Sequence, residues 1–384
     1  MAFEFATANR IIFGEGVLNQ AGEIASGCGQ RALILTGSGS VSIDPLWRVL
    51  QTAGVKGTVF QVDSEPDIPI VMAGIEQAKA HQCELVIGFG GGSVLDTAKA
   101  IAAMLTNPGD LMDYLEVVGG GNEIPNEAAP LLALPTTAGT GTEVTRNAVI
   151  TSPAHQVKVS MRSRKMIPAV ALVDPELTYS MPPSVTASTG MDALTQVMEG
   201  YVSSRANPMT DIICREGVIR GARSLLKAYQ NGQDRFARHD MSLTSLFGGL
   251  ALANGGLGAV HGFAGPIGGM FHAPHGVICA SLLPYVMKYN VLALDQLDDV
   301  GGLRSRYVDL ARWLTGDPQA GIASGVAWVT ELAEALAIPG LRSLGIAPED
   351  FDLIIEKAQA SSSMAKNPVM LSKGFLKAIL EEAF

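Results

Sequence analysis

The chain has 384 residues, of which 47% are hydrophobic and 17% charged, and its formal net charge is −10. This composition argues against a disordered protein, and the scattered lysines and arginines argue against a nucleic-acid partner. The length exceeds that of one typical core, so we expect two domains, and the apolar content favours a homodimer or larger homo-oligomer.

The N-terminal residues and the spacing of the cysteines indicate the cellular compartment in which the protein is expected. The first five residues lack the basic and apolar regions of a signal peptide. The four cysteines lie far apart without CxxC spacing and read as free core thiols of a reducing compartment: Cys28, Cys83, Cys214 and Cys279. We therefore expect a cytoplasmic protein.

The first half of the chain alternates short apolar runs with helix-length segments. Strands are expected at residues 31–36, 57–62 and 84–89, with helices at 45–53 and 68–81. Such alternation is typical of a parallel α/β sheet.

The pattern of apolar residues changes after Pro182-Pro183 from alternating strands and helices to helices alone, and no segment after Asp174 predicts a strand. Helical spacing continues over residues 184–203, 208–230 and 234–257. We expect an α/β domain over residues 1–181 and an all-helical domain over residues 182–384.

A glycine-rich turn, Gly90-Gly91-Gly92-Ser93, follows the strand at 84–89 and opens a helix at 94–105. Glycines let the backbone approach a diphosphate, and the helix N-terminus supplies free N–H groups and a positive dipole end. Ser93 and Asp96 could cap that helix. The alternative is a tight turn, and the segment is not a GxGxxG fingerprint. The candidate cofactor residues are Gly91, Gly92, Ser93 and Asp96.

A second polar loop, residues 135–145, holds five threonines after the apolar run 131–134. Its hydroxyls and amides suit phosphate and ribose hydroxyls, although a plain polar loop would look the same. Lys158, in the β-like run 156–161, offers a charge partner unless it is only solvated. The candidates here are Thr136, Thr137, Thr140, Thr145 and Lys158.

Between Met241 and Met287 the chain runs 47 residues without Asp, Glu, Lys or Arg, and this run contains His261, His272 and His275. An uncharged run of this length is expected in the interior, where clustered imidazoles are good transition-metal ligands. A buried helix pair with histidines bonded to backbone is the alternative. Ten glycines and three prolines should leave no apolar helix of about 20 residues to span a membrane.

Asp192 and Gln196 lie in the segment Gly190-Met-Asp-Ala-Leu-Thr-Gln-Val-Met-Glu-Gly-Tyr201. Their i, i+4 spacing puts them on one helix face. The surrounding apolar residues favour an interior position over a hydrogen-bonded pair on a solvated face.

These segments in this order resemble the iron-dependent, or group III, alcohol dehydrogenase family over nearly the whole chain. The motifs are GGGS with its DTAK helix, PTTAGTGTE, the DP at residues 174–175, GMDAL…EGY and HG…PHG. The resemblance implies a dehydroquinate synthase-like architecture: a nucleotide-binding α/β domain, an all-α C-terminal domain, NAD(P) and one divalent metal ion.

The family's metal ligands, carried onto this chain, fall on Asp192, Gln196, His261 and His275. Gln196 stands where the family usually has a histidine, so metal binding should be weaker, with Fe²⁺ or Zn²⁺ as the ion and zinc often favoured. Gly265 stands where many members have a histidine facing the nicotinamide. We take His272 as a candidate proton relay in its place, although a core role is an equal alternative.

The residues and the resemblance together predict an NAD(P)-dependent alcohol dehydrogenase or aldehyde reductase that works by metal-assisted hydride transfer. The alternatives are a metal-independent reductase like the maleylacetate reductases and an inactive nucleotide-binding relative. Residues 37–40 carry no acid to repel a 2′-phosphate and resemble the turn of NADP-preferring members. NADP should therefore be accepted at least as well as NAD, through Gly37, Ser38 and Ser40.

Overall fold

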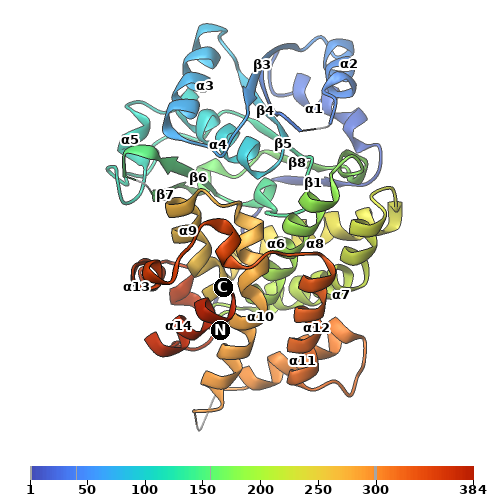
Figure 1. Ribbon diagram of the computed structural model, residues 1–384. Helices are drawn as coiled ribbons and strands as arrows, with labels where there is room; N and C mark the ends of the chain where they lie inside the picture. The colour runs from blue at the N-terminus through green and yellow to red at the C-terminus, as the bar shows by residue number, and fades with distance from the viewer. Residues whose placement is uncertain (1, 40, 156, 298–300) are drawn as a thin grey trace. The chain divides into compact units, whose positions relative to one another are not determined.

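The computed structural model describes residues 2–39, 41–155, 157–297 and 301–384 (Figure 1). The chain forms two compact units. The α/β unit comprises Thr7–Thr137 and Gly141–Met181, and the helical unit comprises Met1–Ala6, Ala138–Thr140 and Pro182–Phe384. The α/β unit holds a parallel sheet, whereas helices alone form the described secondary structure of the helical unit, which confirms the predicted fold class.

Six parallel strands form the sheet of the α/β unit in the order β1-β8-β5-β4-β2-β3. They are β1 (Arg10–Phe13), β2 (Arg31–Gly37), β3 (Lys56–Val62), β4 (Leu85–Gly90), β5 (Leu131–Pro135) and β8 (Val170–Val173). An antiparallel hairpin is added by β6 (Asn147–Ser152) and β7 (Val157–Arg162).

Helices cover both faces of this sheet, because successive side chains of a strand point to opposite faces. Leu33 and Leu35 of β2 belong to the core beneath α3 (Ile68–Ala80) and α4 (Gly92–Thr106). Ala32 and Ile34 belong to the opposite core, with α1 (Ala21–Ser26) and α2 (Asp44–Thr52). Strands buried on both faces explain the near-continuous apolar runs in the sequence.

The expected strands and helices of the α/β unit are present within one or two residues at their ends. The strands β1 and β8 were not recognised from the sequence because four residues carry too little periodicity. The expected cap of α4 is wrong. Gly91 is its N-cap and no side chain caps it, because the carboxylate of Asp96 instead accepts the backbone N–H of Val149 at 3.0 Å.

The helical unit is built around α6 (Pro183–Val202), which is buried continuously from Gly190 to Val202. The helices α7, α8 and α10 pack against it. The other helices are α7 (Pro208–Gln230), α8 (Arg235–Asn254), α9 (Ala259–Phe271), α10 (His275–Leu294), α11 (Leu303–Thr315), α12 (Ile322–Ala335), α13 (Phe351–Gln359) and α14 (Lys373–Glu382).

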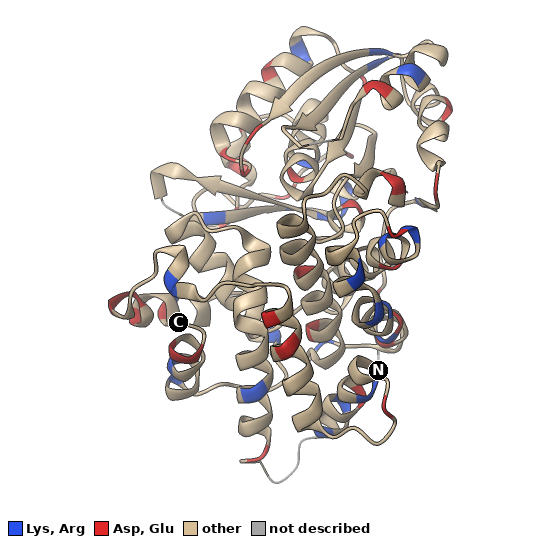
Figure 2. Ribbon diagram, turned by 45° about the vertical axis from the view of Figure 1, so that its right-hand side comes forward, with Lys and Arg blue, Asp and Glu red and all other residues tan. Residues whose placement is uncertain are grey.

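The helix α10 starts in the uncharged run and continues to Leu294. It is long and apolar enough to cross a membrane by length and composition alone, although it reaches that length only by continuing past Met287, where the uncharged run ends. However, 72% of its apolar window is buried inside the helical unit, as in the core helix of a globular protein. Figure 2 shows the charged residues scattered over other parts of the chain, with both signs interspersed.

Candidate metal centre and cofactor loops

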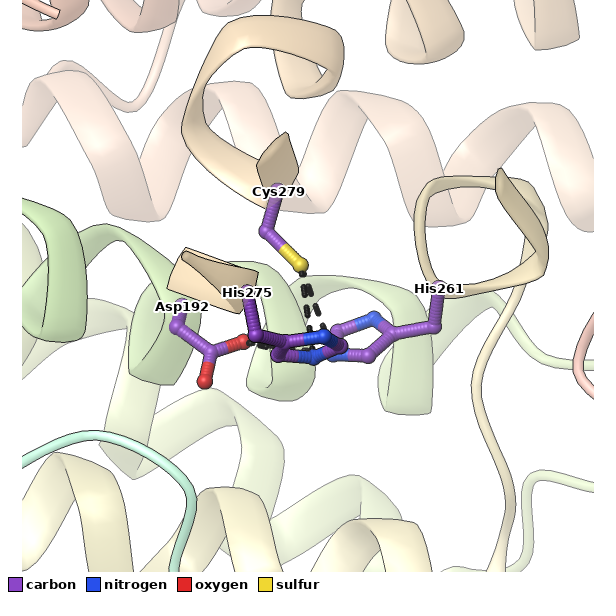
Figure 3. A group of neighbouring side chains, drawn as sticks. All are labelled: Asp192, His261, His275 and Cys279. Carbon is purple, nitrogen blue, oxygen red and sulfur yellow. Dashed lines mark hydrogen bonds and ion pairs between the residues drawn. The ribbon is translucent and has the colours of Figure 1, made fainter. Parts of the chain in front are cut away.

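Four side chains of the helical unit converge at one point (Figure 3): Asp192 of α6, His261 of α9, and His275 and Cys279 of α10. One potential ligand atom from each lies within 4.8 Å of every other. Asp192 Oδ1 is 3.2 Å from His261 Nε2 and 3.9 Å from His275 Nε2. The sequence places these residues up to 87 positions apart, and the packing of three helices brings them together.

The helix α10 supplies two of the four because His275 is its first residue and Cys279 follows one turn later on the same face. Gly276 makes this approach possible. A Cβ atom at Gly276 would lie 2.5 Å from the backbone oxygen of Ser188 in α6, so a larger residue would push the two helices apart.

A buried carboxylate outside the cluster orients His261. Glu199 lies two turns after Asp192 on α6, and its Oε2 accepts the Nδ1–H of His261 at 2.7 Å. Glu199 Oε1 also accepts the backbone N–H of Val260 at 2.7 Å, in the first turn of α9. With Nδ1 bonded to Glu199, Nε2 is the ring atom of His261 that faces Asp192 and Cys279.

The carboxylates and imidazoles of the cluster shift one another's pKa values toward their charged forms. Burial lowers the pKa of His261, but the neighbouring Cys279, Asp192 and Glu199 outweigh it and hold that pKa well above its usual value. Burial raises the pKa of Asp192, and the hydrogen bond from His261 with the charges of both histidines leaves it lowered overall. The site therefore stabilises an ionised carboxylate in the interior.

This donor set fits a divalent transition metal ion. A carboxylate oxygen, two imidazole nitrogens and a sulfur atom face one another, and each can offer a lone pair. A divalent cation among them would replace the positive charge that the imidazole protons supply and would accept all four lone pairs. The cluster is buried apart from His275, whose side chain is 33% exposed.

Three other residues that the sequence analysis singled out in this region, Gln196, His272 and Gly265, are not part of the four-residue cluster. Gln196 is buried, and with its amide nitrogen toward the backbone it donates to Thr140 O at 3.1 Å and Gly248 O at 3.2 Å. His272 is exposed at the C-terminal end of α9, with φ of 52°. A Cβ atom at Gly265 would meet nothing within 4 Å, so a side chain there has room.

The glycine-rich turn and the start of the threonine loop, Thr136 and Thr137, lie side by side in the α/β unit, because they follow the neighbouring parallel strands β4 and β5. The backbone N–H of Thr136 donates to Gly90 O at 3.0 Å. A Cβ atom at Gly91 would lie 3.3 Å from the side chain of Thr137, so the glycine keeps the turn close to the threonine loop. Gly92 and Ser93 open α4 and are half-buried.

A fully buried lysine ties these loops together. Lys99 Nζ donates to Thr145 Oγ1 at 2.7 Å and to the backbone oxygen of Asn147 at 2.8 Å. It also contacts Thr142 Oγ1 and lies 3.3 Å from Asp96 Oδ1. The hydroxyl of Thr145 and the carboxylate of Asp96 are thus engaged within the unit.

Burial raises the pKa of Glu143, in the same loop, to about 7. The other predicted cofactor residues of this unit are more exposed. Gly37 ends β2, Ser38 is exposed, and Ser40 lies outside the described residues. Lys158 forms an ion pair with Glu65 at 3.0 Å.

Sequence reasoning missed three residues: Cys279, Glu199 and Lys99. Cys279 was read as a core thiol, although its spacing of four from His275 puts both on one helix face. Glu199 follows Asp192 by seven residues, which is also a same-face spacing. Lys99 belongs to the quoted DTAK segment but gave no sign that it is buried.

Comparison with known proteins agrees with this reading. Residues 8–175 match the iron-containing alcohol dehydrogenase family, and residues 186–384 match the C-terminal region of the Fe-containing alcohol dehydrogenase family. Alcohol dehydrogenase 4 of Saccharomyces cerevisiae is 35% identical over 378 residues, covering 97% of this chain and 96% of the relative. The 1,3-propanediol dehydrogenase of Klebsiella pneumoniae is 33% identical and covers 100% and 99%.

Two further matches add to this result. The NADPH-dependent butanol dehydrogenase of Clostridium saccharobutylicum is 33% identical over 98% of this chain and 97% of its own. The solved structure of a 1,3-propanediol oxidoreductase has a TM-score of 0.92 at 33% identity, with both chains fully covered.

A parallel-sheet α/β unit and a helical unit with a buried carboxylate–histidine cluster that could hold a metal ion fit the class of metal-containing, nucleotide-dependent dehydrogenases. The chain belongs to the iron-containing alcohol dehydrogenase family. The predicted activity of an NAD(P)-dependent oxidoreductase that interconverts a small alcohol and its carbonyl compound is confirmed at the level of the family. Neither the metal-independent nor the inactive alternative finds support.

Proposed function

We propose that the enzyme reduces short-chain aldehydes to primary alcohols at the helical-unit cluster, and that Asp192, His261 and His275 hold one divalent metal ion there. The observation that carries the proposal is the convergence of a buried carboxylate oxygen and two imidazole nitrogens, 3.2 and 3.9 Å from it. A bound divalent ion would supply a Lewis acid that polarises the substrate oxygen.

Three side chains are proposed to orient the metal ligands, leave the site accessible and transfer protons. Glu199 keeps the Nδ1–H of His261 occupied, so that its Nε2 is available to the cluster. The one-third exposure of His275 leaves the cluster accessible from that side. His272, which is exposed three residues before His275, is the proposed proton relay.

For the cofactor, we propose that the diphosphate binds backbone N–H groups of Gly91, Gly92 and Ser93 at the N-terminus of α4. Thr136 and Thr137 supply further donors from the adjacent loop, while Asp96 and Thr145 support it through Lys99. Lys158 remains a proposed charge partner. In this proposal residues 1–181 bind the cofactor and residues 182–384 bind metal and substrate.

The test is a scan of small primary alcohols, aldehydes and oxoacids by absorbance of the reduced nicotinamide. Each substrate is assayed with apoenzyme prepared by chelation and after addition of Fe²⁺ or Zn²⁺. We expect turnover of alcohols and aldehydes only with metal. Equal turnover with and without chelator would contradict the proposed metal site.

NADP is proposed to bind at least as well as NAD, because the described residues of the segment 37–40 include no carboxylate. The similarity to the NADPH-dependent butanol dehydrogenase of Clostridium saccharobutylicum supports the same preference. Dissociation constants of the two cofactors test it. A preference for NAD of tenfold, or about 1.4 kcal/mol, would contradict it.

We also propose a homo-oligomer in a reducing, cytoplasmic setting. The edge strands β1 and β3 expose Ile11 and Val59, with 37% and 43% of each residue accessible, and exposed sheet edges favour pairing. The four cysteines are free thiols. Light scattering of the purified chain would contradict the first part if it gave a monomer.

A further inference from the structure

We propose that the Cys279 thiolate is the fourth metal ligand of this enzyme and takes the place that Gln196 does not fill. The resulting donor set is one carboxylate, two imidazoles and one thiolate. This inference rests on the proposed metal site of Asp192, His261 and His275.

The position of the sulfur atom fits a ligand of the same ion. Cys279 Sγ is 3.8 Å from His261 Nε2 and 3.7 Å from His275 Nε2. Zinc bond lengths and a tetrahedral angle place sulfur and nitrogen ligands about 3.6 Å apart, and nitrogen and oxygen ligands about 3.4 Å apart. The observed separations, including 3.2 and 3.9 Å from Asp192 Oδ1 to the histidines, scatter around these values.

A thiol that only donates a hydrogen bond does not account for this arrangement. Cys279 has one S–H proton, yet its sulfur faces two imidazole nitrogens at nearly equal distances. The His261 ring already uses Nδ1–H to bond Glu199. Its Nε2 is the ring atom that faces the sulfur and the carboxylate oxygen, so the loss of one proton would let it join both of them around a shared cation.

Gln196, in contrast, is held by the backbone. Its amide nitrogen lies within hydrogen-bond distance of Thr140 O and Gly248 O, at 3.1 and 3.2 Å. A Cβ atom at Gly248 would lie 3.1 Å from the Cβ atom of Gln196, so α8 packs closely against this side chain. Gln196 thus links α6 to α8 and the segment 138–140, and α10 supplies the fourth donor instead.

A thiolate among the ligands changes the expected metal. Sulfur is a softer donor than imidazole or carboxylate and favours zinc over iron among the ions commonly available. We therefore expect the enzyme to retain Zn²⁺ more tightly than Fe²⁺, although its family is named for iron.

The test uses Co²⁺ as a spectroscopic probe of the full-length chain, because a cobalt–thiolate bond gives an intense near-ultraviolet charge-transfer band that nitrogen and oxygen ligands do not. Apoprotein is titrated with Co²⁺ and then with Zn²⁺ in competition. The variants are Cys279→Ser, which preserves size, and Cys279→Ala. Cys214→Ala is the matched control, since Cys214 is also a fully buried thiol of the helical unit. Gln196→Leu tests the competing ligand.

We expect the band in the wild type and in Cys214→Ala, and its loss in both Cys279 variants. Their zinc affinity should fall by at least the ten- to hundredfold that loss of an outer hydrogen-bond partner costs. Cobalt binding without the band, or variants that keep the wild-type band and affinity, would overturn the inference and leave the proposed metal site standing. So would a Gln196→Leu variant that loses affinity while Cys279→Ser keeps it. Failure of the wild type to bind either ion would overturn both.

Discussion

Glu199 and His261 are joined by a 2.7 Å hydrogen bond from the imidazole Nδ1–H to the carboxylate Oε2. The same carboxylate accepts the backbone N–H of Val260, so it also neutralises the positive end of α9. One buried group on α6 therefore fixes both the entry of α9 and the direction of its imidazole. The histidine reaches the cluster already oriented.

Replacing this carboxylate by an amide should weaken the metal site without removing a ligand. We expect Glu199→Gln to lower zinc affinity by roughly ten- to hundredfold, the usual effect of losing an outer carboxylate partner. A competition titration with a chelating dye measures it. Glu382→Gln, at a partly exposed ion pair with Lys288, is the control. Unchanged zinc affinity in Glu199→Gln would show that the ring needs no orientation by Glu199.

The buried lysine of the α/β unit should matter mainly for stability. Lys99→Met leaves the carboxylate of Asp96 without its cationic partner, and breaking a buried pair costs about 3–5 kcal/mol. We expect urea denaturation to report a loss of this size. Lys377→Met, at an exposed pair with Glu381, should change stability by less than about 1 kcal/mol. Equal effects of the two substitutions would contradict the structural role of Lys99.

Glu143 gives the α/β unit a pH-dependent stability. Burial raises its pKa in the folded state from 4.5 to about 7. Between these values the folded protein keeps a proton that the unfolded chain has released, so this contribution to stability falls as pH rises. It amounts to roughly 3 kcal/mol across the window and is constant above it.

Glu143→Gln should remove that dependence. The variant should match the wild type near pH 4.5 and exceed its unfolding free energy by up to about 3 kcal/mol at pH 8. The measurement is the difference between the two proteins in urea at several pH values. The exposed Glu381→Gln should show no such trend. A difference independent of pH would mean that Glu143 is ionised throughout.

The helices could be predicted from the sequence more completely than the residues of the site. The helix α7 lies at residues 208–230 as expected, because Asn207 caps it and Pro208 starts it with a preset φ. The four-residue strands gave no comparable signal. For the site, apolar context and missing charge indicated buried histidines, but His261 of α9 meets Glu199 of α6 and Cys279 of α10, which lie on other helices. Only the packing of α6, α9 and α10 shows which atoms meet.

A further prediction concerns cofactor choice at Gly39. A Cβ atom there would meet nothing within 4 Å, so a side chain can be added without a clash. Gly39→Asp should place a carboxylate where the 2′-phosphate of NADP is proposed to bind and should raise its dissociation constant about tenfold relative to NAD. Gly39→Asn is the uncharged control of the same size. An equal effect of both substitutions on both cofactors would contradict the proposed position of the phosphate.

Two substitutions at His272 should distinguish a structural role of this residue from a catalytic one. This residue ends α9 in the left-handed conformation, with φ of 52°, which costs a non-glycine residue about 1 kcal/mol. His272→Gly should therefore stabilise the fold by up to that amount, whereas His272→Ala keeps the strain and removes only the imidazole. If His272 relays protons, both variants should lose turnover equally, and the pH dependence of the rate should change in both. Wild-type turnover in both variants, with a change only in the stability of His272→Gly, would assign the residue a structural role alone.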